Sequence, residues 1–289
     1  MRAIAAFTCV MLFAGLAPLA LAEGWALQGP LGQVPERISD TLPLSDQDNT
    51  GNWTLDKVFS DEFHANSLND TRWDLVPSGQ GDDPLGQSPA VFTHENVTVS
   101  GGMLHIAFRK ERMPWMNDNP DFDYTSGLVH THERTHYGYY ETRARAMNSA
   151  GSSAFWLSWT GLPDNATEID IFEIGGKTKE GKYDRLYNMH AHIWVTPESQ
   201  EHKDIGAVWK APWRLADDFH VYGFDWQEDL LRWYVDGVLV RSLPNTNWHF
   251  PMQMVFDSEA MWNWFGEVDE ADLPSSFDVD YVRVWRRGE

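Results

Sequence analysis

The sequence predicts an all-β protein that folds as a sandwich of two antiparallel sheets. Its hydrophobic pattern mostly has a period of two, as in residues 137–147, where core-type and polar side chains alternate. Asp236-Gly237, between two runs of apolar residues, is a strong hairpin signal. We find no long stretch with the apolar stripe of a helix, and many short strands without helices are typical of a sandwich or a barrel. We expect the sandwich because the domain is large and its strands are numerous.

The expected strands follow one another along the chain. Residues 97–99 and 103–108 flank a Gly-Gly pair and predict a hairpin, and residues 137–147 predict one long strand. Residues 231–240 contain the hairpin around Asp236-Gly237, and residues 277–285 form the closing strand. Beyond about residue 50 we find no linker, repeat or low-complexity tract. Residues 51–289 are therefore expected to form one domain.

The N-terminal residues have the pattern of a secretory signal peptide. Within residues 1–22, Arg2 precedes the apolar stretch Ala3–Leu16, and Ala20-Leu21-Ala22 is a small-x-small cleavage site. The apolar stretch is shorter than the roughly 20 residues that span a membrane. We therefore expect export to the periplasm or the medium. Residues 23–50 show no clear periodicity and predict an irregular leader that either wraps the surface or stays mobile.

Charge and cysteine content exclude several classes of protein. The formal net charge is −21, and binding to nucleic acid or to an anionic membrane requires a basic surface. The single cysteine, Cys9, lies in the predicted signal peptide, so the exported chain would have no disulfide, thiolate metal site or cysteine nucleophile. The chain also contains 15 Trp, whose flat indole faces can stack on sugar rings as well as fill a core. The sequence gives no sign of oligomerisation, and we expect a monomer.

Three acidic residues lie close together in one predicted strand, residues 168–173. Because side chains alternate faces along a strand, Glu168 and Asp170 share one face. Glu173 would lie on the opposite face of a regular strand, but a β-bulge near Ile171-Phe172 would return it to the acidic face. Like charges so close together repel one another, so this arrangement is costly unless it has a function. An exposed acidic strand without function is the alternative, and spacing alone does not decide between the two.

Glycoside hydrolysis would explain the carboxylates. A retaining hydrolase needs one carboxylate as nucleophile and a second as general acid, and Asp170 between them would help to hold the pair in different protonation states. Downstream, His190 and His192 share a strand face. They could bind a metal, but no third ligand is evident from the spacing, so hydrogen bonds to sugar or to an acidic neighbour are favoured over a metal site or a purely structural role.

With its surroundings, the Glu-x-Asp-x-x-Glu motif resembles glycoside hydrolase family 16. Five segments carry this resemblance in order along the domain: Asp61-Glu62-Phe63 with Trp73, Tyr137–Arg143, Ala154–Leu157, Glu168–Glu173 and Val279–Trp285. The resemblance implies a concanavalin-like β-jelly-roll sandwich with a substrate cleft on a concave sheet. It further implies that Glu168 is the nucleophile and Glu173 the general acid/base, with Asp170 assisting.

The resemblance also suggests residues that contact substrate or calcium. We expect the substrate to be a polysaccharide, and the candidate binding residues are Trp156, Trp159, His190, His192, Glu259 and Trp262. Catalysis in the family needs no cofactor. Some members bind a structural calcium through their first and last strands, for which Glu62 and Asp280 are the candidates.

Several segments favour one branch of the family. Residues 124–127, 147–156, 188–192 and 256–265 look more like red-algal galactan hydrolases, the agarases, porphyranases and carrageenases, than like glucanases. The Ile174-Gly-Gly176 that follows Glu173 departs from the commonest agarase form. The expected activity is endo-hydrolysis of β-galactosidic linkages. A laminarinase-like β-glucanase and a non-catalytic, lectin-type sandwich are the alternatives.

Overall fold

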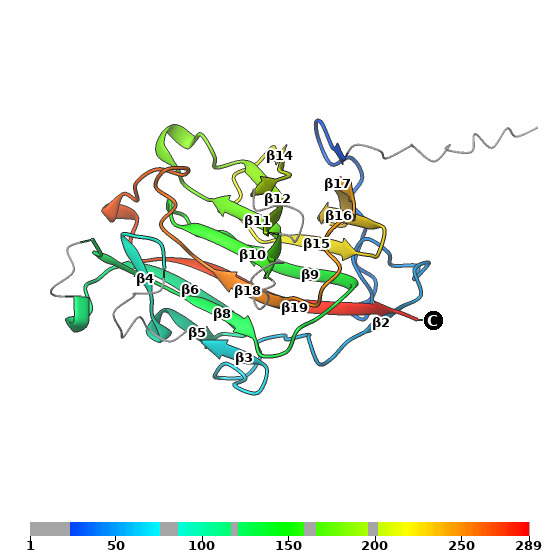
Figure 1. Ribbon diagram of the computed structural model, residues 1–289, viewed down its shortest axis with the longest axis horizontal. Coiled ribbons are helices and arrows are strands. Elements are labelled where there is room, and N and C mark those ends of the chain that lie inside the picture. The colour runs from blue at the N-terminus through cyan, green and yellow to red at the C-terminus, as the bar shows by residue number, and fades with distance from the viewer. Residues whose placement is uncertain (1–23, 76–85, 117–120, 159–165, 196–201, 289) are drawn as a thin grey trace, which may run out of the picture.

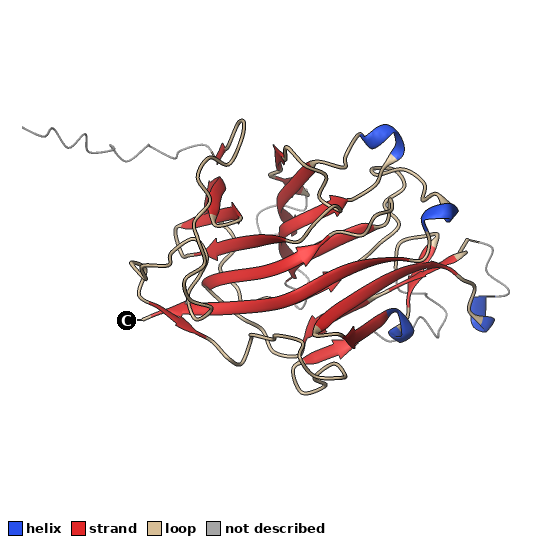
Figure 2. Cartoon of the chain, turned by 180° about the vertical axis from the view of Figure 1, so that it is seen from behind, coloured by secondary structure: helices blue, strands red, loops and turns tan. Residues whose placement is uncertain are grey.

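The computed structural model describes residues 24–75, 86–116, 121–158, 166–195 and 202–288. Within these ranges the chain forms strands β1 to β19 and short 3-10 turns η1 to η4, without any α-helix (Figures 1 and 2). The predicted all-β class is therefore confirmed. The described residues contain no helix long and apolar enough to cross a bilayer.

One of the two sheets has eleven strands. Their order is β1-β17-β16-β15-β9-β19-β6-β7-β4, with β2 beside β19 and β5 beside β6. These strands are β1 (Trp25–Ala26), β2 (Trp53–Leu55), β4 (Ala90–Phe92), β5 (Val97–Ser100), β6 (Met103–Lys110), β7 (Tyr124–Ser126), β9 (Gly138–Arg145), β15 (His220–Trp226), β16 (Leu230–Val235), β17 (Val238–Pro244) and β19 (Ser275–Arg287).

The other sheet has eight strands in the order β13-β12-β11-β10-β18-β8-β3, with β14 beside β12. They are β3 (Trp73–Leu75), β8 (Leu128–Thr131), β10 (Ser152–Ser158), β11 (Ala166–Gly175), β12 (Leu186–Val195), β13 (Lys203–Asp204), β14 (Ala207–Lys210) and β18 (Gln253–Asp257). The 3-10 turns are η1 (His94–Asn96), η2 (Pro114–Met116), η3 (Lys179–Gly181) and η4 (Glu270–Asp272). The described strands pair antiparallel, as predicted, except for the parallel pair β4 and β7.

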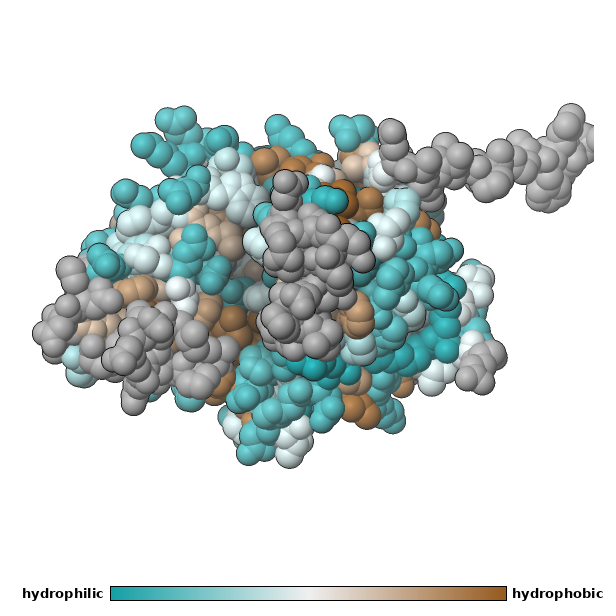
Figure 3. All heavy atoms as spheres, viewed as in Figure 1, coloured by the Kyte–Doolittle hydropathy of each residue, from teal (hydrophilic) through white to brown (hydrophobic). Residues whose placement is uncertain are grey.

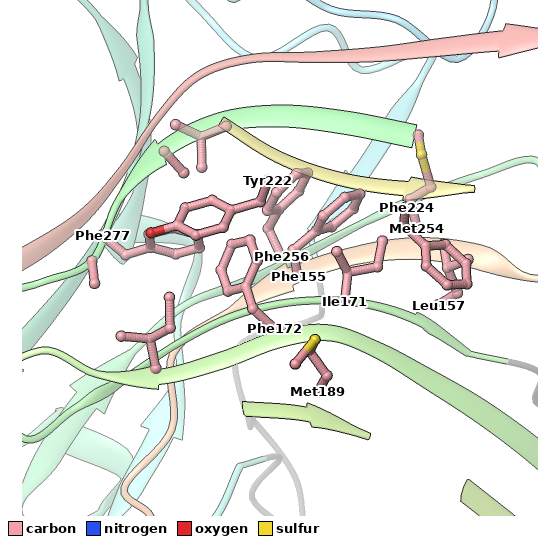
Figure 4. Close-up of a cluster of buried hydrophobic side chains, with 14 of the residues drawn as sticks. Phe155, Leu157, Ile171, Phe172, Met189, Tyr222, Phe224, Met254, Phe256 and Phe277 are labelled. Carbon is pink, nitrogen blue, oxygen red and sulfur yellow. The ribbon is translucent and has the colours of Figure 1, made fainter. Parts of the chain in front are cut away.

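The core lies between the two sheets and is rich in aromatic rings (Figure 4). Phe155 of β10 stacks on Phe256 of β18, with ring centroids 4.2 Å apart. Phe172 of β11 reaches across to the other sheet, where its ring lies 4.7 Å from that of Tyr222 and 6.0 Å from that of Phe277. Burying side chains of this size supplies most of the stabilisation of such a sandwich. The core fixes β10, β11 and β18 side by side.

Most of the expected local elements form as the sequence predicts. Asp236 and Gly237 join β16 and β17 with φ angles of 48° and 77°, the positive values that this hairpin turn requires. β5 and β6 form the hairpin expected around Gly101-Gly102. The segment around Asp61, one of those that carry the family resemblance, makes an isolated antiparallel bridge to Val282.

The described part of the leader, residues 24–50, lies against the eleven-stranded sheet. Its β1 pairs with β17, and the amide of Leu44 donates to Glu141 Oε2 at 2.8 Å. Arg37 forms an ion pair with the same carboxylate. These contacts favour the wrapping alternative for residues 24–50. The predicted signal peptide, residues 1–22, lies outside the described residues.

Candidate active site

The acidic strand, β11, contains the predicted bulge. Phe155 pairs with Phe172 and Trp156 with Asp170, so Ile171 has no partner on β10. This extra residue returns Glu173 to the face that carries Glu168 and Asp170. The intervening Ile169, Ile171 and Phe172, in contrast, are fully buried in the core. We call the outer face of the eight-stranded sheet, which carries Glu168, Asp170 and Glu173, the acidic face.

The carboxyl groups of the trio differ in how readily they lose a proton. Burial raises the pKa of Glu168, but the neighbouring His192 and a hydrogen bond from Trp194 oppose the rise. The pKa of Glu173 is raised well above its usual value by burial and then by the charges of Asp170 and Glu168. Glu173 therefore tends to keep its proton at a pH at which Glu168 has lost it. Two carboxylates with separated pKa values are what an acid and a nucleophile on one site need.

Asp170 is the most buried member of the trio, with 4% of its surface exposed. Burial, followed by the charges of Glu168 and Asp204, raises its pKa well above the usual value. Its Oδ2 lies 3.1 Å from Nε2 of His192. That oxygen has no hydrogen bond of good geometry among the described residues. Asp170 is thus held between Glu168 on its own strand and His192 on the next.

Strand β12 places a row of polar side chains beside the trio. Its pairing with β11 sets His192 opposite Glu168 and Asn188 opposite Glu173. Trp194, two residues beyond His192, is 41% exposed, and its Nε1 donates to Glu168 Oε2 at 3.3 Å. The same strand therefore supplies an imidazole, an amide and an indole to the acidic face.

Two of the predicted substrate-binding residues lie on the other side of the trio. Trp156 of β10 is half-buried, and its Nε1 donates to Asp257 Oδ1 at 3.2 Å. Burial and the charge of Glu259 raise the pKa of Asp257 well above its usual value. Burial also raises the pKa of Glu259 to about 7. The acidic character of this face thus extends from β11 to the end of β18, two strands that lie on either side of β10 (Figure 1).

The remaining predicted substrate-binding residues differ in where they lie. His190 lies on the acidic face and contacts Asp204, with Nδ1 and Oδ1 2.8 Å apart. Trp262 is partly buried against the core and makes an edge contact with Tyr124. Its neighbour Trp264, which the sequence did not single out, is the indole that contacts His190. Trp159 lies outside the described residues.

Glu62 and Asp280 do not fit a calcium site as they stand. Both oxygens of Glu62 accept hydrogen bonds from Arg283, at 2.7 and 2.9 Å. Asp280 Oδ2 accepts one from Arg143 at 2.8 Å. Calcium takes six to eight oxygen ligands, whereas these carboxylates are already neutralised by guanidinium groups. In the part of the chain described, neither belongs to a group of His, Asp or Glu able to hold an ion.

Sequence reasoning missed several residues that line the acidic face. Trp194 could have been found, because it continues the alternation of His190 and His192 along β12. Asp257 could also have been found, since it lies two residues before Glu259. Asp204 and His202 carry no local signal, because their position depends on how β13 pairs with β12.

Comparisons with known proteins find similar sequences and folds. A family model described as the GH16 domain of β-porphyranases A–D matches residues 53–287. The chain is 30% identical to β-porphyranase B of Zobellia galactanivorans, over 81% of this chain and 85% of that protein. The crystal structure of the same porphyranase superimposes with a TM-score of 0.68 at 26% identity, covering 81% of this chain and 92% of the other.

Other relatives act on different polysaccharides. The chain is 29% identical to the kappa-carrageenase of Pseudoalteromonas carrageenovora, over 88% of this chain and 70% of that protein. The laminarinase catalytic domain of Thermotoga maritima superimposes with a TM-score of 0.67 at 25% identity, covering 82% of this chain and all of the other. The likenesses thus extend to both galactan and glucan hydrolases.

Proposed function

Because this chain belongs to glycoside hydrolase family 16, with the GH16 domains of the β-porphyranases, we propose that it is an endo-acting retaining hydrolase of β-galactosidic linkages. Its substrates would be red-algal galactans, either agarose and porphyran or carrageenan. The observation that carries the proposal is the acidic face, where Glu168 and Glu173 share one side of a bulged strand and have different protonation tendencies.

The proposed reaction has two displacements. In the first, Glu168 attacks the anomeric carbon while Glu173 gives its proton to the glycosidic oxygen, so the C–O bond breaks and a glycosyl ester forms. In the second, water attacks the same carbon, passes its proton to Glu173 and releases Glu168. Two inversions give net retention, and the reaction uses no cofactor. Asp170 and His192 would position and tune the nucleophile.

The substrate class rests on the porphyranase family model and on the aromatic side chains around the trio. Trp156 and the exposed Trp194 lie on opposite sides of Glu168 and Asp170, and indole faces can stack on sugar rings. Glu259, at the end of β18, would accept hydrogen bonds from sugar hydroxyls.

The first test is reducing-end release from agarose, porphyran, carrageenans, laminarin and lichenan. We expect release from one galactan, and Glu168→Gln should abolish it while leaving the fold and sugar binding intact. Glu228→Gln, in the exposed turn after β15, is the matched control and should retain full activity. Retention of activity by Glu168→Gln would remove Glu168 from the nucleophile role. Net inversion, seen by proton NMR early in the reaction, would rule out the double displacement.

A laminarinase-like β-glucanase is the second candidate, favoured by the structural likeness to the Thermotoga maritima laminarinase. Release from laminarin or lichenan, with none from galactans, would establish it. Sugar binding without turnover, unchanged by Glu168→Gln, would instead support a lectin-type protein.

We further propose that the protein is exported and acts as a monomer. The pattern of residues 1–22 predicts cleavage after Ala22. N-terminal sequencing of the protein recovered from the medium or the periplasm should therefore begin at Glu23. A monomeric mass is expected in sedimentation analysis.

A further inference from the structure

Two neighbouring strands place imidazole and carboxylate groups together at one edge of the acidic face. His190 and His192 project from β12, and Asp204 projects from β13, where it pairs directly with His192. We call these three residues the imidazole–carboxylate cluster. None of them lies in the acidic motif of β11, so the proposed hydrolysis leaves Asp204 without a role.

The ligand atoms of the cluster converge. Asp204 Oδ1 lies 2.8 Å from Nδ1 of His190 and 3.8 Å from Nδ1 of His192. One ligand atom from each of the three residues lies within 4.8 Å of the others. The two imidazole rings are nearly parallel, with centroids 5.6 Å apart, so their Nδ1 atoms can face a common point. A tetrahedral metal site requires four ligands, and this arrangement can supply three of them.

His192 is oriented as a metal ligand usually is. Its Nε2 faces Asp170 Oδ2 at 3.1 Å, which leaves Nδ1 directed toward the cluster. A histidine that binds a metal through one ring nitrogen commonly turns the other toward a carboxylate, which fixes the ring. Asp170 is almost fully buried, and its Oδ2 lacks a hydrogen bond of good geometry among the described residues. A cation on the other side of His192 would strengthen this contact.

His202 is a candidate for the fourth ligand, and there is open space beside the cluster. His202 Nε2 lies 2.9 Å from Nδ1 of His192. A Cβ at Gly206 would come within 2.9 Å of Nδ1 of His190 and 3.5 Å of Asp204 Oδ1. Because Gly206 has no side chain, the space beside His190 Nδ1 and Asp204 Oδ1 stays open.

We propose that His190, His192 and Asp204 bind one divalent transition-metal ion of the Zn²⁺ type, with His202 supplying the fourth ligand. Imidazole nitrogen with a single carboxylate suits Zn²⁺, Co²⁺, Ni²⁺ or Cu²⁺, whereas Ca²⁺ takes oxygen ligands alone. The nearby carboxylates of Glu168 and Asp170 give the site a negative potential that attracts a cation. The site is distinct from the hydrolytic trio, although His192 contacts Asp170.

Metal binding can be measured without any substrate, so the result does not depend on the proposed hydrolysis. The full exported chain, freed of any affinity tag and treated with a chelator, should bind one equivalent of Zn²⁺ in competition with a chromophoric chelator. Excess Ca²⁺ should not displace it. Co²⁺ should give the intense visible absorption of a four-coordinate site. Zn²⁺ should also raise the melting temperature of the wild type, because it binds the folded state.

Three substitutions test the site by different means. His190→Gln and Asp204→Asn each remove a ligand, and Gly206→Ala places a methyl group in the open space while keeping every ligand. Each should weaken Zn²⁺ binding at least about tenfold, the lower bound seen when even supporting residues of metal sites are changed. His220→Gln is the matched control, since it removes a His–Asp pair of the same 2.8 Å length on the other sheet. It should leave Zn²⁺ affinity unchanged.

Either result of the Zn²⁺ measurements decides whether the site exists. A wild type that binds no Zn²⁺ would overturn the proposal, and so would an affinity that His190→Gln and Asp204→Asn leave unchanged. Near-UV circular dichroism of each variant identifies a loss of fold. If Asp204→Asn fails to fold, Gly206→Ala and His190→Gln still test the site.

Discussion

Asp278 on the eleven-stranded sheet and the acidic trio on the eight-stranded sheet have pKa values shifted in opposite directions. On the eleven-stranded sheet, Asp278 accepts bonds from Arg145 and His105, each at 2.7 Å. Burial raises its pKa, but these bonds outweigh the rise, so that the pKa lies below its usual value. On the acidic face, no lysine or arginine pairs with Glu168, Asp170 or Glu173 among the described residues. There, burial and mutual repulsion raise the pKa instead.

The difference separates carboxylates that stabilise the fold from those that can do chemistry. An acid whose bonds from arginine and histidine outweigh its burial, as at Asp278, is ionised near neutral pH and cannot donate a proton there. An unpaired, buried acid destabilises the fold but holds its proton, which is what a general acid requires. The one guanidinium that acts on Asp170, Arg241, lies behind β12 and donates to the carbonyls of Met189 and Ile205. Its charge lowers the pKa of Asp170, but it forms no ion pair with that carboxylate among the described residues.

The largest expected effect is on the acidic face. Glu173→Gln cannot exchange a proton, so it should lower kcat by about 10²- to 10⁴-fold, the usual contribution of general acid catalysis. The measurement is turnover of the galactan identified in the substrate panel. With a substrate whose leaving group needs little protonation, the variant should regain much of the lost rate of the first displacement. Equal losses on both substrates would remove Glu173 from the acid role.

The next effect should appear on the other sheet, as a loss of stability with catalysis intact. Arg37→Met leaves the fully buried Glu141 with bonds only from Leu44 and Tyr281. Removing one partner of a buried pair should lower the free energy of unfolding by about 3 kcal/mol. Urea denaturation measures the loss, and kcat should not change.

A second variant separates the charge from the packing. Arg37→Met combined with Glu141→Gln leaves no uncompensated charge, so it should be more stable than Arg37→Met alone. If the double variant is no more stable, the loss comes from packing of the leader rather than from a buried charge.

A smaller effect of opposite sign is expected on the acidic face. Burial, followed by the charge of Glu259, raises the pKa of Asp257 above its unfolded value, so ionising Asp257 destabilises the folded chain. The destabilisation is absent below the unfolded pKa and grows as the pH rises toward the folded pKa. Asp257→Asn should therefore raise the free energy of unfolding by about 1 kcal/mol at pH 8. At about pH 3, below the unfolded pKa, the variant and the wild type should be equally stable.

The Asn side chain keeps an oxygen that can accept from Trp156 Nε1, so the comparison isolates the charge. Urea denaturation at the two pH values is the measurement. An equal change at both would mean that packing, and not ionisation, is responsible.

The sequence predicts those parts of the molecule that depend on local pattern. Alternation along 137–147 predicts β9, and the spacing of Glu168 and Glu173 predicts the bulge, since both follow from the two-residue period of a strand. Partners across the sheets are different. Arg37 is 104 residues from Glu141, and Asp204 reaches His190 only through the pairing of β13 with β12. No local pattern encodes either contact.

The positions of two tryptophans near the end of the chain also depend on the path of the chain rather than on a local pattern. Trp262 and Trp264 are two positions apart in a segment without regular strand alternation, so periodicity does not say which of them faces the acidic face. In the fold, Trp262 packs against the core and Tyr124, whereas Trp264 contacts His190. Trp262 is the predicted substrate-binding residue, but the path of the chain brings Trp264 to His190.

The smallest effect tests how the acidic face tunes Glu173. As a general acid, Glu173 must be protonated, so activity should fall as the pH rises through its raised pKa. Glu259 contributes to that rise through its charge, after burial and the charges of Asp170 and Glu168. Its own pKa is about 7, so it is partly ionised near neutral pH. Glu259→Gln should therefore move the alkaline limb of the kcat profile to lower pH, by less than about one unit.

Glu270→Gln, in the exposed turn η4, provides the matched control and should leave the profile in place. KM is recorded separately, because Glu259 is also a candidate for binding sugar. A change in KM with an unmoved kcat profile would limit Glu259 to binding. A shift of the limb to higher pH would contradict the electrostatic account, since removing a negative charge can only make Glu173 easier to ionise.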